Sequence, residues 1–281
     1  MTIVVSEYRD NTMVYEYDNP LELEELQPEG KNALSRNHMH GSSIKWHGVE
    51  GGVPRVLEIR ERGWPDGYKR AQETIGEIAE LPQLMDFRRK RRFADHGDQI
   101  HMDRVMAGRL DIAWESRKRE ASAGMGMGVT RIMVGIGATA SYSAEQMYWR
   151  GAVACLLADA LEMSGRPVEI IAYSHVAGSY PRYKHKNRCD IITLKQADQM
   201  LDIDTIAACT AMAGYFRHFV FKARLSDPKR LCADNMGTTI NMPPEGYYDR
   251  DNDIVIDNVW TQHEAELFIK RELEKYKKES A

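Results

Sequence analysis

The sequence lacks several features that would point directly to a kind of protein. Its four cysteines include no C-x-x-C pair, so a structural zinc site is not expected. The 38 basic and 42 acidic residues leave a formal net charge of −4, which excludes the global basic excess of many nucleic-acid-binding proteins. Any contact with nucleic acid must therefore come from a local patch.

Long apolar runs are also missing. The most apolar window, residues 152–161, contains Asp159 and is too short to span a bilayer. The N-terminus has no basic segment followed by an apolar stretch, so we expect no signal peptide. We expect no membrane contact, a cytoplasmic location, and buried or free thiols in a reducing compartment. The thiols are Cys155, Cys189, Cys209 and Cys232.

Motifs for covalent catalysis and for nucleotide binding are absent as well. The sequence has no G-x-S-x-G elbow, and no cysteine lies in a nucleophile motif. The glycine-containing turn at residues 135–143 matches neither G-x-G-x-x-G nor the P-loop pattern. We therefore expect no catalytic residue and no cofactor, and we favour a protein that is not an enzyme.

The sequence does contain a regular succession of strands and helices after residue 126. Apolar runs at residues 131–136, 167–173 and 190–194 predict strands. Ser143, with Gln146 three residues later, predicts the capping box of a long buried helix that ends at Gly165. Because a helix separates the first two strands and none separates the last two, we expect a parallel and then an antiparallel pair.

The remaining predicted elements complete the fold class. A helix over residues 206–222, a strand over 253–256 and a helix capped by Thr261 follow. The first 125 residues predict a helix over 68–81 and a charge-dense stretch over 84–120. We therefore predict an α/β domain over residues 126–281 with an open, mostly parallel sheet and one antiparallel strand. An irregular, α-rich and charge-rich region precedes it over residues 1–125.

This order of strand, hydroxyl-rich turn, buried helix, strand and antiparallel strand resembles the start of a von Willebrand factor A domain. That family carries Asp-x-Ser-x-Ser in the first turn, where it holds a divalent metal. Gly135 or Gly137 stands here in place of the aspartate. Since a hard cation needs charged oxygen ligands, the resemblance implies a degenerate site with weak or absent metal binding.

A second resemblance concerns the segment 143–171, with Trp149-Arg150-Gly151-Ala152 at its core. It is similar to uncharacterised proteins of bacteriophages and mobile elements, over about residues 85–275. This resemblance implies a phage or prophage origin and the cytoplasm of a bacterial host.

The predicted partner-binding surface lies at the top of the sheet. Neutral hydroxyls of the first turn and the interleaved aromatic and basic residues of the loop after the second strand would form it. These residues are Thr139, Ser141, Ser143, Tyr180, Arg182, Tyr183, Lys184, Lys186 and Arg188. We expect a binding or scaffold protein with a protein partner, for which an ATPase or an assembly component is a candidate; nucleic acid is the other candidate.

Two further clusters keep alternatives open. The basic patch Arg88, Arg89, Lys90, Arg91 and Arg92 would contact phosphate or a partner, or else form a solvated charged segment. A His/Asp group would make the protein a metal-dependent enzyme acting on nucleic acid. This group comprises His38, His40, His96, Asp98 and His101. A virion or assembly component is the third alternative.

Overall fold

The computed structural model describes residues 4–7, 12–26, 44–76, 89–94, 99–100, 105–106, 114–119, 128–177, 187–226 and 238–279. The chain forms two compact units. The first contains residues 1–81 and 129–281, and the second contains residues 82–128. Each unit has its own β-sheet.

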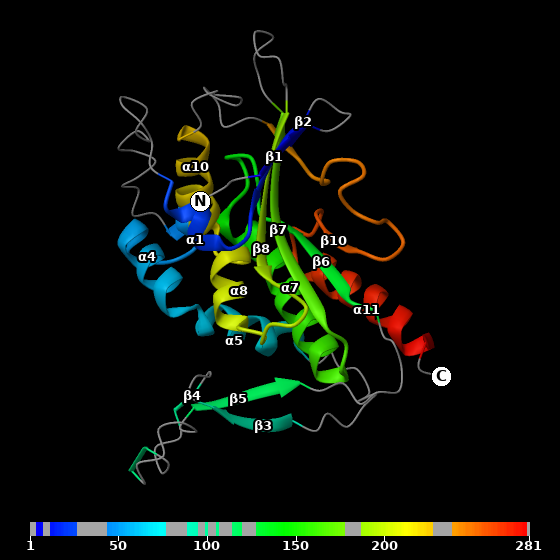
Figure 1. The fold of residues 1–281 in the computed structure, drawn as a ribbon. Helices are drawn as coiled ribbons and strands as arrows, with labels where there is room; N and C mark the ends of the chain where they lie inside the picture. The colour runs from blue at the N-terminus through cyan, green and yellow to red at the C-terminus, as the bar shows by residue number, and fades with distance from the viewer. Residues whose placement is uncertain are drawn as a thin grey trace. The chain divides into compact units, whose positions relative to one another are not determined.

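The sheet of the first unit is open and mixed. Its strands are β1 (Val4–Glu7), β2 (Thr12–Tyr17), β6 (Thr130–Gly135), β7 (Val168–Ala177), β8 (Asn187–Lys195), β9 (Thr238–Ile240) and β10 (Ile254–Ile256). The order is β1-β2-β8-β7-β6-β10, and β9 pairs with β7 (Figure 1). β6 is parallel to β7 and β10, and β7 is antiparallel to β8, which confirms the predicted α/β class.

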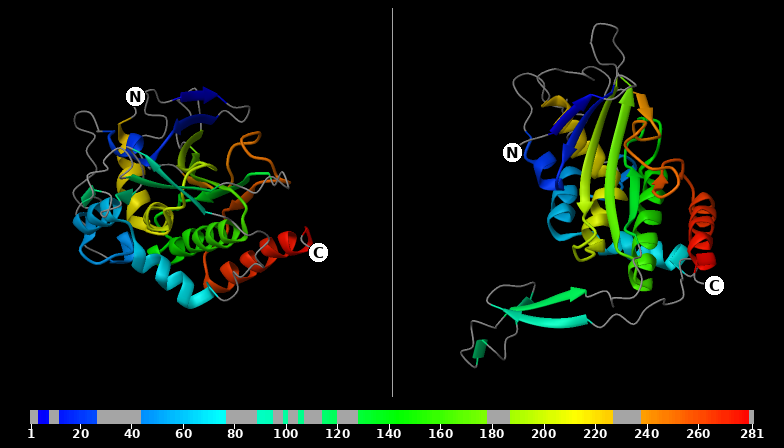
Figure 2. Two further views of the ribbon diagram at one scale, coloured as in Figure 1. Left: turned by 60° about the horizontal axis from the view of Figure 1, so that its bottom comes forward. Right: turned by 45° about the vertical axis from the view of Figure 1, so that its right-hand side comes forward.

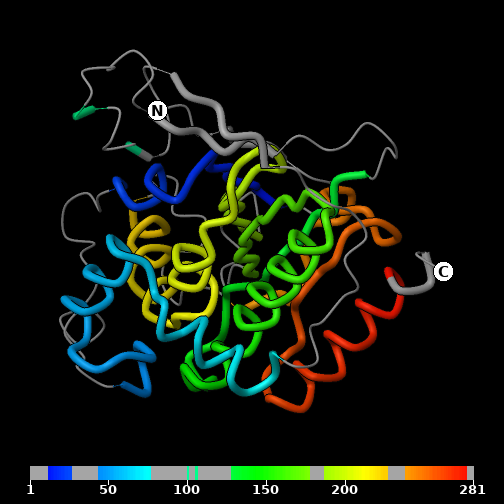
Figure 3. The backbone as a smooth tube through the Cα atoms, turned by 90° about the horizontal axis from the view of Figure 1, so that it is seen from below, coloured from blue at the N-terminus to red at the C-terminus, as the bar shows by residue number. Residues whose placement is uncertain are grey.

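The helices of the first unit are α1 (Pro20–Glu24), α3 (Ile44–His47), α4 (Gly52–Arg62), α5 (Pro65–Ile75), α7 (Ala144–Ser164), α8 (Ile203–Thr210), α9 (Ala213–Tyr215), the π-helix η4 (Phe216–Val220), α10 (Phe221–Leu225) and α11 (Gln262–Glu279). Figures 2 and 3 show α4, α5, α7, α8 and α11 on one face of the sheet. Successive residues of β6 point to opposite faces of the sheet. Ile132 and Val134 belong to the large core that the helices cover, and Met133 belongs to a smaller cluster with Ile171 and Tyr173.

The predicted start and end of α7 are confirmed. The Ser143 hydroxyl accepts a hydrogen bond from the backbone N–H of Gln146, and the Gln146 side chain accepts one from the Ser143 N–H. Gly165 ends the helix with φ at 104°, a conformation that glycine adopts without the steric cost of a Cβ atom. Thr261 likewise accepts a hydrogen bond from the Glu264 N–H at the start of α11.

The helix predicted over residues 206–222 is instead divided. α8 ends at Thr210, and α9, η4 and α10 continue the segment after Ala211 and Met212. The backbone of α7 approaches so closely here that a Cβ on Gly151 would lie 2.3 Å from the Ala211 nitrogen. The crossing thus requires glycine at position 151, and periodicity alone gives no sign of the break.

The structure divides the chain differently from the boundary predicted near residue 125. β2 lies in the same sheet as the later strands, since it pairs in parallel with β8 from Thr12–Asn187 to Tyr17–Ile192. Val56 and Ile75 of the N-terminal helices belong to the same core cluster as α7. Residues 1–81 of the N-terminal region therefore form one compact unit with the α/β domain, and residues 82–128 form the other.

The second unit contains three strands that the sequence does not predict. These are β3 (Arg89–Ala94), β4 (Gln99–Ile100) and β5 (Trp114–Arg119), in the order β3-β5-β4 with antiparallel pairing. The two long strands lack the apolar alternation by which a half-buried strand is recognised, because charged residues occupy both faces.

Two compositional expectations can be compared with the structure. Cys155, Cys189 and Cys209 are buried, as predicted, and Cys232 lies outside the described residues. Over the described ranges, no helix is both long and apolar enough to cross a membrane.

Candidate functional site at the carboxyl end of the central strands

The strand order reverses between β6 and β10. The chain passes from β6 through α7 to β7 on one side, and it reaches β10 on the other side of β6 near its end. In open α/β sheets, ligands bind in the crevice outside the carboxyl ends of strands at such a reversal. Here the turn at residues 136–143 follows the carboxyl end of β6, and the segment at 257–261 follows the carboxyl end of β10 (Figure 1).

Close packing accounts for the two glycines of the turn. A Cβ on Gly135 would lie 3.0 Å from the Tyr173 hydroxyl oxygen and 3.4 Å from a terminal nitrogen of Arg150. A Cβ on Gly137 would lie 2.6 Å from the Ser174 hydroxyl oxygen. The space that a longer side chain would need, including an aspartate, is occupied by these neighbours.

Arg150 of α7 lies beneath this turn. Its side chain is buried, with 2% of the residue exposed, and one terminal nitrogen donates to the Gly137 carbonyl at 2.9 Å. Its guanidinium carbon lies 4.2 Å from the centre of the Trp260 ring. Among the described residues, its Nε and its other terminal nitrogen have no hydrogen-bond partner. Burial lowers the pKa of Arg150 to about 10, so the guanidinium is still charged at neutral pH.

A second buried guanidinium holds the other end of the turn. Arg217 of η4 donates to the Tyr142 carbonyl at 2.6 Å and to the Trp46 carbonyl, and its guanidinium lies 4.0 Å from the centre of the Trp46 ring. Burial lowers the pKa of Arg217 to about 10. Two positive charges thus lie beneath one short turn.

Two aromatic rings cover the cluster. Tyr142 stacks on Trp260 with ring centres 3.9 Å apart and an interplanar angle of 17°, and both residues are partly exposed. Asp257, at the end of β10, is the acidic group that acts on Arg150. Burial raises the pKa of the Asp257 carboxyl, although backbone N–H groups and Arg150 oppose the change. The charged form of Asp257 is thus less favourable than in water, although Arg150 stabilises it.

The structure brings part of the predicted partner-binding set to this place. The hydroxyls of Thr139 and Ser141 lie 2.8 Å apart on the turn. Ser143 uses its hydroxyl to cap α7. The loop residues Tyr180, Arg182, Tyr183, Lys184 and Lys186 lie outside the described residues.

Arg188 lies elsewhere and is not a surface contact. It is 1% exposed on β8 and pairs with Asp190 at 2.7 Å. The same carboxylate also pairs with Arg224 at 3.2 Å, and Tyr17 donates a hydrogen bond to it at 3.4 Å. The predicted role of Arg188 in partner binding is therefore wrong for this conformation, because its guanidinium belongs to a buried ion network.

The predicted metal ligands cannot be placed. His38, His40, His96, Asp98 and His101 all lie outside the described residues. Within the described ranges, no group of three or more His, Cys, Asp or Glu side chains could hold a metal ion. At the turn itself, a cation would meet the charge of the buried Arg150 guanidinium, and like charges at short range repel strongly where water is excluded.

Arg150 and Arg217 are not among the residues that the sequence predicts for the site. One signal could have found Arg150: it interrupts a helix whose neighbouring positions are apolar, and a charge on an otherwise buried helix needs a partner. Arg217 carries no comparable signal, because its position depends on the π-helical turn.

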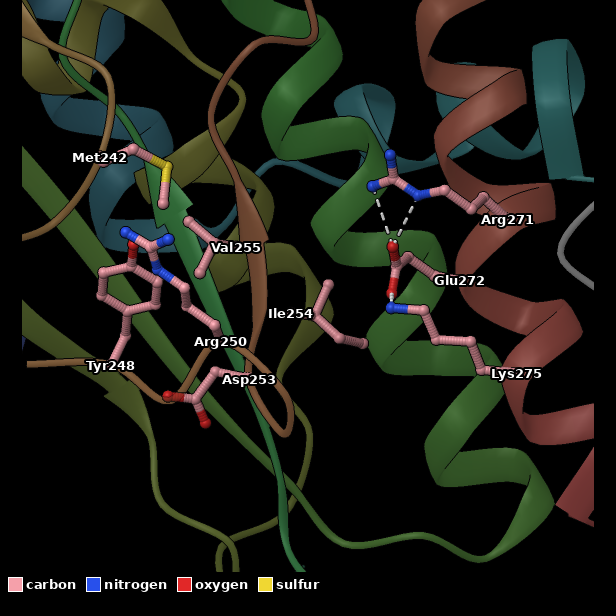
Figure 4. A pocket seen from close by; sticks show the side chains of 9 residues that line it. All are labelled: Met242, Tyr248, Arg250, Asp253, Ile254, Val255, Arg271, Glu272 and Lys275. Atoms are coloured by element: carbon pink, nitrogen blue, oxygen red, sulfur yellow. Dashed lines mark hydrogen bonds and ion pairs between the residues drawn. The ribbon is translucent and has the colours of Figure 1, made fainter.

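A pocket of about 510 Å³ beside β10 is a second place where a ligand could bind (Figure 4). Tyr248 and Arg250 line one side, and Arg271, Glu272 and Lys275 of α11 line the other. Glu272 is bridged by Arg271 at 2.9 Å and by Lys275 at 2.6 Å. Because Glu272 already pairs with both cations of α11, the pocket offers less to a charged ligand than the turn does.

The fold and the site together define an α/β protein with a basic cluster buried at the carboxyl end of its central strands. The family model described as "Domain of unknown function (DUF7192)" matches residues 4–280, and the chain belongs to this family. No curated protein and no solved structure shows a significant match.

Proposed function

We propose that the protein is a non-enzymatic binding protein that receives an acidic side chain of a protein partner at the turn between β6 and α7. The observation that carries this proposal is Arg150, a buried guanidinium with two nitrogens that lack partners in the described part of the chain. A carboxylate matches the planar guanidinium and accepts two parallel hydrogen bonds from it.

The charge balance around the turn supports an anion as ligand. Arg150 and Arg217 bring two positive charges; Asp257 is the acidic group that acts on Arg150, whereas burial alone shifts the pKa of Arg217. The N-terminus of α7, 21 residues long, adds the positive end of the helix dipole. Thr139 and Ser141 can donate further hydrogen bonds from the rim.

Binding would require the aromatic cover to move. Trp260 lies over the guanidinium and Tyr142 stacks on Trp260; both residues are partly exposed, so a rotation of these rings into solvent would open Arg150 to a ligand. A carboxylate on Arg150 would then replace the contact with the Trp260 ring. The fluorescence of Trp260 should report this exchange directly.

The other expectations stay predictions. The order of β6, α7, β7 and the antiparallel β8 supports the resemblance to a von Willebrand factor A domain. A degenerate metal site, a phage or prophage origin, a cytoplasmic location and an ATPase or assembly partner remain parts of the proposal. The metal-dependent enzyme and the virion component remain alternatives.

Titration with a short poly-glutamate peptide, followed by calorimetry and tryptophan fluorescence, tests the proposed site. We expect binding that a poly-glutamine peptide does not reproduce, and at least about tenfold weaker binding in Arg150→Met, which corresponds to one lost charge-assisted contact. Asp257→Asn should bind more tightly, because a competing carboxyl is removed. Arg62→Met, a change at an exposed arginine of α4, is the matched control and should bind normally.

Two results would overturn the proposal. One is equal binding of the glutamate and glutamine peptides. The other is unchanged affinity in an Arg150→Met protein that is folded by circular dichroism.

A further inference from the structure

The two basic runs of the second unit are opposite each other in one β-ribbon. β3 and β5 are antiparallel, with the register Arg89–Arg119, Lys90–Lys118, Arg91–Arg117 and Arg92–Ser116. The two runs are about 25 positions apart in the sequence, so the sequence alone shows two separate patches. The pairing makes them one surface.

Both faces of the ribbon are basic. Directly opposed residues share a face, and successive residues alternate between faces. One face therefore carries the positions of Arg89, Arg91, Arg117 and Arg119, and the other carries Lys90, Arg92 and Lys118. Across both strands, Glu115 is the one acidic residue against these seven basic ones.

This register is unfavourable unless an anion is present. Three directly opposed pairs have like charge, and such cross-strand pairs destabilise a sheet. Positions where a sequence breaks a local rule are often functional, with the compensation supplied by a ligand. A polyanion lying along the ribbon would provide that compensation.

The second unit is also basic as a whole, whereas the rest of the chain is acidic. The segment 82–128 has 10 basic and 7 acidic residues, a net charge of +3, which leaves −7 for the rest of the chain. The net charge of −4 is therefore the sum of a basic second unit and an acidic remainder of the chain. Such asymmetry orients a protein on a negatively charged partner.

We propose that the ribbon formed by β3 and β5 binds double-stranded DNA through its phosphates. The major groove of B-DNA, about 12 Å wide, admits a two-stranded β-ribbon. β4 pairs only with Glu115 and Trp114 of β5, so among the described strands the basic end consists of two strands alone. This end has the width that the groove accepts.

Other nucleic acids fit less well. Duplex RNA has a deep and narrow major groove that side chains do not read. Single strands are bound on platforms where aromatic rings stack on the bases, and the paired positions 89–92 and 116–119 contain no aromatic residue. The inference is independent of the anion site near Arg150, which lies in the first unit.

Fluorescence anisotropy of the full chain with a labelled DNA duplex, across a salt series, tests the ribbon. Each phosphate contact contributes about −0.9 to the slope of log affinity against log salt. Replacing Arg89, Arg91, Arg117 and Arg119 with Gln should reduce that slope by up to about 3.6 and weaken binding at least about 100-fold at low salt. Lysine at the same four positions should retain most of the binding.

The matched control removes four exposed cations of the first unit, with the changes Lys45→Gln, Arg62→Gln, Lys69→Gln and Lys270→Gln. It should bind the duplex nearly as the wild type does. The ribbon variant should melt no lower than the wild type, since repulsion is removed, and should bind poly-glutamate normally. Unchanged duplex affinity in the ribbon variant, an equal loss in the control, or equally tight binding of single-stranded DNA or duplex RNA would overturn the proposal.

Discussion

Two pairs of arginines are buried in the first unit, and their surroundings differ. Arg188 and Arg224 share the carboxylate of Asp190, at 2.7 and 3.2 Å. Arg150 and Arg217 instead donate to backbone carbonyls of the turn after β6 and lie against indole rings. The first pair is held by a formal charge, whereas the second pair is held by dipoles and aromatic faces.

The pKa shifts of these arginines express the same difference. Burial tends to lower the pKa of Arg188, but Asp190 outweighs it and the pKa lies above its ordinary value. At Arg150 and Arg217, burial prevails and lowers the pKa to about 10. A buried cation in the second situation gains most from an anion that arrives from outside, which is why the turn and not the ion network is the candidate site.

Removal of the shared carboxylate should have the largest effect. Asp190→Asn leaves Arg188 and Arg224 buried without their counter-ion, and breaking a buried ion pair in this way costs about 3–5 kcal/mol. Urea unfolding at neutral pH measures the change. Glu58→Gln removes an exposed pair with Arg55 and should shift the urea midpoint far less, so a similar shift in both variants would contradict the comparison.

Acidification should weaken the region around Arg217. Burial, with help from Lys222 and His47, lowers the pKa of His218 to about 4. The unfolded chain, with a His pKa near 6.5, binds more protons between these values, so the free energy of unfolding should fall by about 2 kcal/mol as pH drops from about 7 to 4. The free energy of unfolding of His218→Phe, measured across the same pH range, should lack this fall. The exposed His263→Gln variant should retain it.

Arg150 should contribute much less to stability than Arg188. Arg150→Met exchanges a buried cation with partnerless nitrogens for an apolar chain, and we expect a change within about 1.5 kcal/mol of zero. Arg188→Met removes the shorter of the two ion pairs of Asp190 and leaves the carboxylate with Arg224 and Tyr17, so it should cost clearly more. Thermal and urea unfolding of both variants give the contrast; equal losses would place Arg150 among the structural arginines.

The cap of α7 should have the smallest effect. Ser143→Ala removes the hydroxyl that accepts from the Gln146 N–H and should cost about 1 kcal/mol. Both guanidiniums keep their positions and charge, so affinity for a poly-glutamate peptide should change less than twofold. A large loss of affinity would show that the hydroxyl itself binds the ligand. Ser143→Thr, which keeps the cap, is the control.

Local signals predicted the central fold correctly. The apolar run before Gly135, the capping box at Ser143 and the missing helix before residue 190 fix β6, α7 and the antiparallel β8, because these features act between neighbours in the chain. Thr139 and Ser141 lie on the predicted turn for the same reason, since a turn after a central strand is visible in the sequence, and their role in binding stays a prediction.

Long-range pairings were out of reach of the same reasoning. The partner of β2 lies on β8, and the partner of the basic run on β3 lies on β5; neither register has a signal in one sequence. The surroundings of Arg150 include the ring of Trp260, which lies 110 positions further along the chain. The sequence of one segment does not show which distant segment pairs with its strand or packs against its buried charge.

The pairing of β2 with β8 has a consequence during synthesis. Thr12 must wait for Asn187, and at about 5–20 residues per second the ribosome needs roughly 10–35 seconds to make that stretch. Throughout this time β2 lacks the β8 edge that it joins in the folded sheet, although its antiparallel partner β1 has already been made. β1 and β2 are therefore made long before the strand that completes their place in the sheet, and a chaperone that shields them during synthesis should raise the yield of folded protein.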